Sequence, residues 1–417
     1  MRILILGINY GPELISSAVY TTGLAERMAQ EGHEVEVVSA LPYFPAWRVF
    51  EGWRGIRWRR ETPLPRLRVT HCPLYVPSTP SGARRILHHA SFALSAFPVA
   101  VWSALRRPPD LVFVVAPSMV SAPVGALAAW ISGAKSWLHI QDFEVEAAFA
   151  TGLLPEKSQI GRLAVAFEAW VLRRFDRISS ISGPMVAKLQ SKGVPARNTY
   201  ELRNWANLGR IKPLATPSPL RRELGIVTPF VALYSGNLAN KQGLEILPEM
   251  ARLLSHRDDL TFVICGDGPL RAQLMEASAN LPNMRFFPLQ PIEKLNDLMG
   301  LADIHLLPQI AGAADLMLPS KLTNILASGR PVLATAEPDT SLWAEVTGAG
   351  LLTTPGDSVA AEAGLETLLN DAELRSALGA EARRRALERW DMVAILERLQ
   401  REFIDMRQEN LAGEEIR

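Results

Sequence analysis

The sequence has little cysteine, no excess of one charge and no long uninterrupted apolar run. Its 417 residues include two cysteines, Cys72 and Cys265. This count excludes a disulfide framework and a cysteine-based metal site, and it fits a reducing cytosol. The formal net charge of +1 gives no indication of nucleic-acid binding. No stretch reaches about 20 apolar residues without interruption, so no ordinary membrane span is expected.

Several signature motifs are also missing. The sequence contains no P-loop pattern G-x-x-x-x-G-K-[ST], no H-E-x-x-H, no C-x-x-C and no acidic cluster with EF-hand spacing. The glycine-containing loop over residues 7–13 lacks the G-x-G-x-x-G spacing of dinucleotide-binding proteins. Lysines and helix dipoles can neutralise a bound phosphate without a metal. We therefore expect neither a metal nor a cofactor.

Length and periodicity indicate two α/β domains in tandem. A chain of 417 residues, 48% of them hydrophobic, is too long for one ordinary core. Residues 2–6 read as a strand, a helix is expected from about Ser17, and residues 34–39 read as the next strand. This βαβ unit implies a parallel sheet, and its first apolar run is too short for a signal peptide. The same alternation restarts at residue 230, so we expect two doubly wound sheets.

A proline-rich stretch marks the domain boundary. Residues 212–219 contain three prolines and read as a linker. We expect an N-terminal Rossmann-like domain over 1–208 and a C-terminal Rossmann-like domain over 222–388. Residues 389–417 are helical by pattern and long enough to pack back toward the N-terminal domain.

Two segments of the first half combine aromatic and basic residues. Residues 41–60 contain three tryptophans and five arginines. They fit either a loop that faces a ligand or a membrane, or a packed surface loop with arginines stacked on tryptophans. Residues 81–107 hold about sixteen mostly apolar residues, with Pro98 inside. That segment is too short and too broken to span a bilayer comfortably.

The basic ends of residues 81–107 favour contact with an anionic membrane surface. The flanking arginines are Arg84, Arg85, Arg106 and Arg107. The alternative is an ordinary buried helix of the first domain.

Polar side chains follow the strand expected over residues 136–140. His139 lies near its end, and Asp142 and Glu144 come directly after it. Open α/β sheets bind ligands at the carboxyl ends of their parallel strands. His139 is therefore a candidate general base, or a hydrogen-bond donor to a sugar or phosphate, with Asp142 in the same site. We expect His33, His71 and His305 to be structural.

Three strand-end loops of the second half combine glycine with polar or basic residues. The candidates are Gly236, Asn237 and Lys241 in the first loop, Gly266, Asp267 and Gly268 in the second, and Asp315, Ser320, Lys321, Leu322 and Asn324 around a helix expected to open at Pro319. Glycines allow close backbone approach, and Lys241 and Lys321 can neutralise a diphosphate. Considered without the other two loops, Lys321 would be interpreted as a solvated lysine. Beside the other loops it indicates a diphosphate contact.

An ordered set of segments resembles a known family. The set consists of GPE from Gly11, PYFP from Pro42, HIQDFE from His139, YSGN from Tyr234, KQGLE from Lys241, CGDGP from Cys265 and LPSKLTNILASGRPV from Leu318. Across nearly the whole chain it resembles the GT-B glycosyltransferases, and within them family four. The chain is most similar to bacterial exopolysaccharide and O-antigen members, such as the colanic acid fucosyltransferase-like and N-acetylfucosaminyltransferase-like proteins. The resemblance implies two Rossmann-like domains that face a cleft, with a C-terminal crossover helix.

The resemblance also implies roles for the strand-end residues. Gly11, Pro12 and Glu13 would lie near the diphosphate or the acceptor, and His139 matches the family's histidine close to the transferred sugar. Gly236 and Lys241 would hold the diphosphate. The residues expected beside the base and ribose are Gly266, Asp267 and Gly268.

The chain departs from the family pattern at three positions. The family usually carries two glutamates separated by seven residues before A-S-G, and here these positions are Leu316, beside Asp315, and Asn324. Asn237 stands where a phosphate-binding arginine is commonest. Ser320 and Lys321 would replace the missing cation, and Asn324 would bond a ribose hydroxyl.

The resemblance implies a retaining, metal-independent glycosyltransferase that is peripheral on the cytoplasmic face of the cell membrane. It would move a sugar from a UDP- or GDP-linked donor to a lipid-linked glycan acceptor in cell-surface polysaccharide synthesis. Fucose and an N-acetylated amino sugar are the candidate transferred groups, and no nucleic-acid partner is expected. Two alternatives stay open. A GT-B-fold nucleotide-sugar 2-epimerase would need no lipid acceptor, and a non-catalytic nucleotide-sugar-binding scaffold would tolerate the loss of the glutamate pair.

Overall fold

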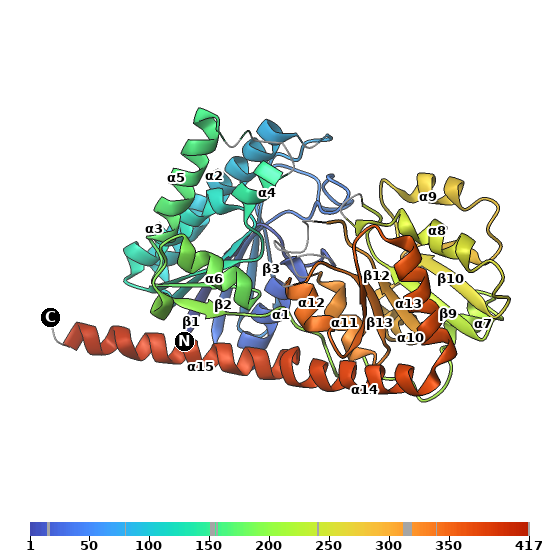
Figure 1. The fold of residues 1–417 in the computed structure, drawn as a ribbon. Coiled ribbons are helices and arrows are strands. Elements are labelled where there is room, and N and C mark those ends of the chain that lie inside the picture. Colours follow the sequence, from blue (N-terminus) through green and yellow to red (C-terminus); the bar gives the residue numbers. More distant parts are fainter. Residues whose placement is uncertain are drawn as a thin grey trace. The chain divides into compact units, whose positions relative to one another are not determined.

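The chain folds into two compact units, each with its own parallel sheet. The computed structural model describes residues 1–14, 17–79, 81–150, 155, 157–239, 242–311, 319–338 and 340–415. The first unit contains Met1–Arg203 and Val393–Arg417, and the second contains Asn204–Met392 (Figure 1). The start and end of the second unit are tied together, because the Ala206 N–H donates to the Trp390 carbonyl at 2.8 Å and the Met392 N–H donates to the Ala206 carbonyl at 3.3 Å.

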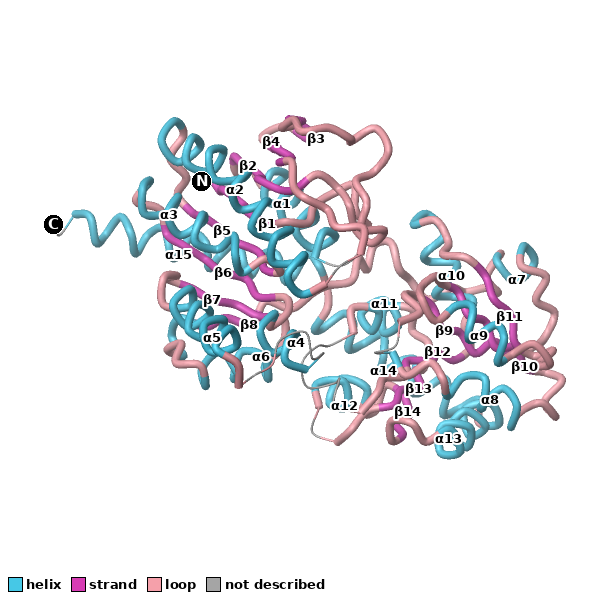
Figure 2. Tube along the Cα trace, turned by 90° about the horizontal axis from the view of Figure 1, so that it is seen from above, coloured by secondary structure: helices cyan, strands magenta, loops and turns pink. Residues whose placement is uncertain are grey.

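The first unit has an eight-stranded sheet in the order β3-β4-β2-β1-β5-β6-β7-β8 (Figure 2). β3 pairs antiparallel with β4. The pairings of β1 with β2 and β5, of β2 with β4, of β5 with β6, of β6 with β7 and of β7 with β8 are parallel. The strands are β1 (Arg2–Gly7), β2 (Glu34–Ala40), β3 (Arg59–Leu64), β4 (Leu67–Cys72), β5 (Leu111–Ala116), β6 (Lys135–Ile140), β7 (Arg177–Ser180) and β8 (Thr199–Glu201).

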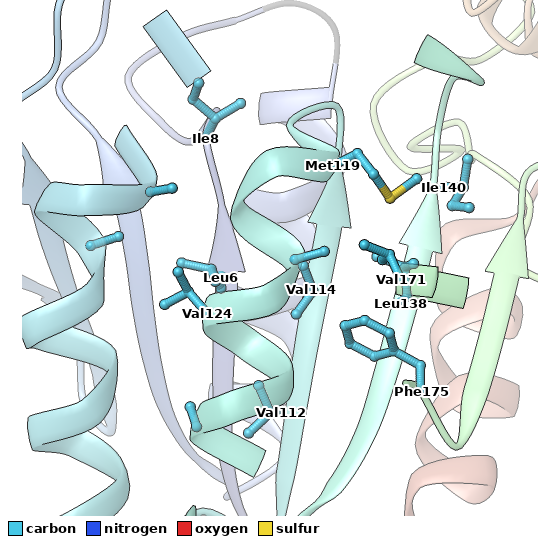
Figure 3. Packing of buried hydrophobic residues seen from close by; sticks show 14 of the residues in the cluster. Leu6, Ile8, Val112, Val114, Met119, Val124, Leu138, Ile140, Val171 and Phe175 are labelled. Atoms are coloured by element: carbon cyan, nitrogen blue, oxygen red, sulfur yellow. The ribbon is translucent and has the colours of Figure 1, made fainter. Parts of the chain in front are cut away.

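Helices cover both faces of this sheet, as a parallel sheet requires. They are α1 (Ser17–Gln30), α2 (Gly82–Arg106), α3 (Ala122–Ser132), α4 (Glu144–Ala150), α5 (Gln159–Leu172), α6 (Gly183–Ser191) and α15 (Met392–Glu415), with 3-10 turns η1 (Met119–Ser121) and η2 (Ala196–Asn198). Alternate strand residues point to opposite faces. Leu6, Val114 and Leu138 pack with Val124 of α3 and Val171 of α5 (Figure 3). On the other face, Phe113 and Trp137 contact Phe403 of α15 at ring-centroid distances of 5.6 and 5.3 Å.

Residues 81–107, which were expected to form a helix too short to span a bilayer comfortably, contain α2. α2 is a continuous helix of 25 residues with Pro98 inside it. Among the described residues it is the one helix long and apolar enough to cross a membrane, judged by length and composition alone. One side of α2 buries Phe92, Ala96 and Ala100 in the core of the first unit. Its opposite side exposes large apolar residues, including Leu94 and Trp102.

The second unit has a six-stranded sheet in the order β11-β10-β9-β12-β13-β14, with parallel pairings throughout. The strands are β9 (Phe230–Ser235), β10 (Leu260–Cys265), β11 (Met284–Phe287), β12 (Ile304–Leu307), β13 (Val332–Thr335) and β14 (Gly350–Thr353). The helices are α7 (Leu220–Glu223), α8 (Ile246–Leu253), α9 (Arg271–Ala277), α10 (Leu295–Leu301), α11 (Lys321–Ala327), α12 (Ser341–Val346), α13 (Ser358–Asn370) and α14 (Ala372–Arg389), with the 3-10 turn η4 (Ile292–Lys294).

Both sheets reverse their strand order at one place. In the first unit β1 lies between β2 and β5, and in the second unit β9 lies between β10 and β12. The loops that follow strands on either side of such a point diverge, and the space outside their carboxyl ends is where open α/β sheets bind ligands. The loops after β9, β10 and β12 carry the residues expected to bind a donor.

Candidate active site

Two glycines let the loops after β9 and β10 pack against each other. A methyl group added to Gly266 would lie 2.0 Å from the carbonyl oxygen of Gly236. The N–H of Gly236 donates to the Cys265 carbonyl at 2.9 Å, and Gly236 has a positive φ of 137°. A side chain at Gly266 would separate the loops, and one at Gly236 would be strained by the positive φ. The glycines of the CGDGP segment are therefore required for packing within the protein.

Gly268 and Asn237 continue this contact between the two loops. A methyl group at Gly268 would lie 2.5 Å from the Leu238 carbonyl oxygen and 2.7 Å from Oδ1 of Asn237. The Leu238 N–H donates to the Asp267 carbonyl at 2.9 Å. The Asp267 side chain is exposed, and one carboxylate oxygen accepts from the Gly268 N–H at 2.8 Å. The two loops thus form one surface at the carboxyl edge of the sheet.

Lys321 reaches this surface from the start of α11. Its ammonium donates to the hydroxyl of Tyr234 at 2.7 Å and to Oε1 of Gln242 at 3.1 Å. The ammonium also lies 4.1 Å from the centroid of the Tyr234 ring, within cation–π range. A methyl group at Gly236 would come within 3.2 Å of the same nitrogen. The structure therefore brings Lys321 together with Gly236, which sequence analysis placed in the same site.

The other residues around α11 are placed differently. The helix begins at Lys321, with Ser320 as its N-cap, rather than at Pro319. Ser320 is exposed and Asn324 is half-buried. The expectation that Leu322 binds the donor is wrong, because its side chain is fully buried in the core of the second unit. Lys241 and Asp315 lie outside the described residues.

Glu13 holds two loops of the first unit together. One carboxylate oxygen accepts from the N–H groups of Tyr43 and Phe44, both at 2.8 Å. The other accepts from the side-chain amide of Asn9 at 2.8 Å. Burial raises the pKa of Glu13, and these hydrogen bonds oppose that rise. Near the same turn, the Gly11 N–H donates to Oγ1 of Thr22 in α1 at 2.9 Å.

His139 is buried, and both of its ring nitrogens have partners. Nδ1 lies 2.9 Å from the hydroxyl of Ser179, and Nε2 lies 2.9 Å from the side-chain amide of Gln141. Phe113 stacks on the ring at a centroid distance of 6.0 Å. Burial lowers the pKa of His139 to about 3, so the ring is neutral at ordinary pH. In this arrangement His139 positions Gln141 and joins β6 to β7.

Asp142 lies in the turn between β6 and α4, and Glu144 is the first residue of α4. Asp142 is half-buried there. The Glu144 carboxylate accepts from the backbone N–H groups of Ser118 and Met119, the latter at 3.1 Å. Burial raises the pKa of Glu144, and these two hydrogen bonds oppose the rise. Glu144 thus fixes the loop that follows β5, beside Asp142.

The residues that position Lys321 in the second unit and His139 in the first unit were not predicted from the sequence. Tyr234 and Gln242 hold Lys321, and Ser179 and Gln141 hold His139. Tyr234 belongs to the quoted YSGN segment, but only its position in a buried strand was apparent. Within the described ranges, no three His, Cys, Asp or Glu side chains form a group that could hold a metal ion.

Family models match both halves of the chain. The model described as "Glycosyl transferase 4-like domain" matches residues 17–205, and the model described as "Glycosyl transferases group 1" matches residues 218–385. With a Rossmann-like parallel sheet in each unit, these matches define a glycosyltransferase of the GT-B fold.

A curated relative extends this assignment over most of the chain. The "Putative colanic acid biosynthesis glycosyl transferase WcaI" of Escherichia coli (strain K12) is 43% identical over 350 residues, which are 82% of this chain and 85% of the relative. The chain therefore belongs to the glycosyltransferases that join a transferase 4-like domain to a group 1 domain. The fold, family and enzyme class predicted from the sequence are confirmed.

Solved structures agree on the fold. Sucrose-phosphate synthase from Thermosynechococcus elongatus matches with a TM-score of 0.74 at 17% identity, covering 97% of this chain and 98% of the other. Anabaena Alr3699/HepE, solved in complex with UDP, matches with a TM-score of 0.69 at 18% identity and covers 97% of this chain and 100% of the other.

Proposed function

We propose that this glycosyltransferase is a retaining, metal-independent enzyme of cell-surface polysaccharide synthesis. It transfers a sugar from a nucleoside diphosphate sugar to a lipid-linked glycan acceptor. The 43% identity to a relative named for colanic acid biosynthesis supports the exopolysaccharide role. Fucose and an N-acetylated amino sugar are the candidate transferred groups, as the sequence resemblance implies.

The position of Lys321 is the observation that carries the proposal. A cation held beside Gly236, at the carboxyl edge of the sheet where β9 and β12 are neighbours, is suited to a diphosphate. Lys321 supplies the charge that the family's arginine would supply at Asn237. Asp267 is exposed on the neighbouring loop, where a ribose or base can reach it. The HepE complex with UDP supports testing uridine nucleotides first.

The proposed chemistry needs no protein nucleophile. The bond between the anomeric carbon and the diphosphate oxygen breaks, and the acceptor hydroxyl oxygen forms the new bond on the same face of the sugar. The hydroxyl proton passes to an oxygen of the departing diphosphate. Lys321 stabilises the negative charge that develops there, and Lys241 is proposed to assist it. Electrostatic stabilisation of developing charge is commonly the largest contribution to catalysis in such sites.

Peripheral attachment to the inner face of the cell membrane is part of the proposal. α2 exposes Leu94, Phe97 and Trp102 on the side away from the core. The guanidinium of Arg106 lies 4.6 Å from the centroid of the Trp102 ring. Apolar and aromatic side chains beside arginines are typical of helices that lie in the interface of an anionic bilayer. Such attachment would bring the enzyme to a lipid-linked acceptor.

Transfer to a lipid is the direct test. Purified protein is incubated with radiolabelled UDP- and GDP-sugars and a bacterial lipid extract, and label is measured in the organic phase. We expect label in the lipid fraction, an unchanged anomeric configuration by NMR, and full activity with EDTA. The Lys321→Ala variant is the control and should transfer little or no label to the lipid fraction.

Each alternative gives a different result. An epimerised nucleotide sugar formed without a lipid would identify a 2-epimerase. Tight nucleotide-sugar binding with no turnover on any extract would identify a scaffold. An inverted product would refute the retaining mechanism, and loss of activity with EDTA would refute metal independence.

A further inference from the structure

We propose that a hollow on the outer side of α2 binds a phosphorylated lipid. The hollow is open, has a volume of about 690 Å³, and is lined by Trp58, Arg60, Pro98, Val99 and Trp102. Its volume lies within the range of sites that hold small ligands. The inference deepens the proposed function, which requires a lipid-linked acceptor, but the binding itself does not depend on sugar transfer.

Two tryptophans provide the aromatic surface of the hollow. Trp58 comes from the segment before β3 and is 48% exposed, and Trp102 comes from α2 and is 56% exposed. The indole N–H of Trp58 donates to the Ser95 carbonyl at 3.0 Å, which fixes the segment before β3 against α2. With this polar atom bonded, the exposed part of Trp58 is apolar. Covering two such rings with a hydrocarbon chain removes a large apolar area from water.

Pro98 and Val99 add apolar lining from the middle of α2. Neither side chain carries a hydrogen-bond donor or acceptor for a polar ligand. The lining of the hollow therefore suits a hydrocarbon chain better than a sugar.

The charges around the hollow are positive. Arg60 lines it and is exposed, and the guanidinium of Arg106 lies over Trp102. No carboxylate is among the lining residues. Glu61, next to Arg60, lies 2.9 Å from Nε2 of His71, and Glu36 of β2 accepts from the hydroxyl of Ser103, next to Trp102, at 2.8 Å. A phosphate attached to a chain in the hollow would meet arginines and no free carboxylate among the residues just named.

A lipid phosphate has two sources, a membrane phospholipid and a polyprenyl-linked acceptor. Soluble probes used below their micelle concentrations separate these sources from general membrane adsorption. We suggest calorimetric titration of the full chain with farnesyl phosphate, farnesol and dihexanoylphosphatidylglycerol. We expect one farnesyl phosphate per chain, and weaker binding of farnesol, which lacks the phosphate.

Matched variants locate the binding. Trp102→Ala and Trp58→Ala should each lower the affinity for farnesyl phosphate at least tenfold. Arg60→Gln should lower the affinity for farnesyl phosphate but not the affinity for farnesol. Trp170→Ala is the control, because Trp170 is 40% exposed on α5 and has Arg174 at 4.9 Å from its ring centroid, yet lies outside the hollow. An unchanged thermal unfolding transition in every variant shows that the chain is folded.

The outcomes are distinct. A preference for farnesyl phosphate identifies a polyprenyl-linked ligand, and equal binding of dihexanoylphosphatidylglycerol identifies a membrane phospholipid; both support the hollow. The proposal is overturned if no lipid binds, or if farnesol binds as tightly as farnesyl phosphate. It is also overturned if Trp170→Ala lowers the affinity for farnesyl phosphate as much as the variants in the hollow do. Lipid binding without sugar transfer contradicts only the proposed function, and sugar transfer without lipid binding in the hollow contradicts only this inference.

Discussion

The Lys321 ammonium lies 2.7 Å from the Tyr234 hydroxyl, although the two residues are 87 positions apart in the chain. The same hydroxyl donates to the Asn237 carbonyl at 2.7 Å, which turns its lone pairs toward the lysine. Tyr234 itself is fully buried in β9. The strand thus sets the position of the cation, and the cation is fixed before any ligand arrives.

Lys321→Ala should weaken nucleoside diphosphate binding. A charge-assisted hydrogen bond contributes about 1.5–3 kcal/mol, so we expect affinity to fall by roughly 10- to 150-fold. Isothermal titration calorimetry with UDP and GDP measures the change. Lys294→Ala is the control, since Lys294 pairs with Glu223 elsewhere in the second unit. Unchanged affinity in Lys321→Ala would remove the lysine from the donor site.

Tyr234→Phe tests whether the tyrosine acts through the lysine. The variant keeps the ring and removes the hydroxyl that orients the ammonium. We expect a smaller loss of nucleotide affinity, about three- to tenfold, because the ammonium loses one of the hydrogen bonds that orient it. In the double variant with Lys321→Ala the two losses should not add, because residues in contact are energetically coupled. Additive losses would show that Tyr234 and Lys321 act independently.

Gly266→Ala should separate the loops after β9 and β10. Its added methyl group would meet the Gly236 carbonyl oxygen at 2.0 Å, and backbone must move to relieve this contact. We expect a lower apparent melting temperature and weaker nucleotide binding. Gly183→Ala is the matched control, because the nearest atom to its added methyl group is Oε2 of Glu201 at 3.6 Å. Equal behaviour of the two variants would refute the close packing of the loops.

The strand pattern and the donor loops could be predicted because they depend on local sequence. Alternating or continuous apolar runs mark strands such as β5, and the glycines that follow β9 and β10 are visible in the chain. The contact between Lys321 and Gly236 followed from topology, since parallel strands bring their carboxyl ends to one edge.

The partners of single side chains could not be predicted in the same way. The backbone donors to Glu13 are about thirty positions away, and Ser179 is 40 positions from His139. Nothing local distinguishes a histidine aimed at a ligand from one bonded on both nitrogens. The prediction that Leu322 binds the donor was wrong for a related reason. Its neighbour Lys321 points to the site, whereas Leu322 points to the core. The helix through Pro98 persists because its packed side buries Ala96 and Ala100.

His139 should make the protein less stable in acid. Its pKa is about 3 in the folded chain and near the ordinary value of 6.5 when unfolded. The unfolded state therefore binds the extra proton between these values. The contribution of His139 to the free energy of unfolding is therefore highest above pH 6.5. It falls by about 1.4 kcal/mol per pH unit as the pH drops from 6.5 toward 3.

Replacing His139 tests this pH dependence. His139→Gln should reduce the slope of denaturant-derived stability between pH 6.5 and 4.5, although buried His305, with a pKa also lowered to about 3, retains part of it. The exposed His256, changed to Gln, should leave the slope as it is. If His139→Gln instead shifts the pH optimum of transfer while the stability slope persists, the histidine takes part in catalysis as the sequence suggested.

Removing the arginines at the two ends of α2 should release the protein from anionic membranes. Each arginine near such a surface contributes about 1 kcal/mol, so changing Arg84, Arg85, Arg106 and Arg107 to Gln should weaken binding by roughly 10²- to 10³-fold. Sedimentation with phosphatidylglycerol vesicles measures the bound fraction, and raised salt should mimic the change. A control with equal loss of charge replaces four exposed arginines away from α2, namely Arg210, Arg222, Arg252 and Arg398. If both sets weaken binding alike, net charge rather than α2 governs attachment, and if neither does, the membrane-facing role of α2 is wrong.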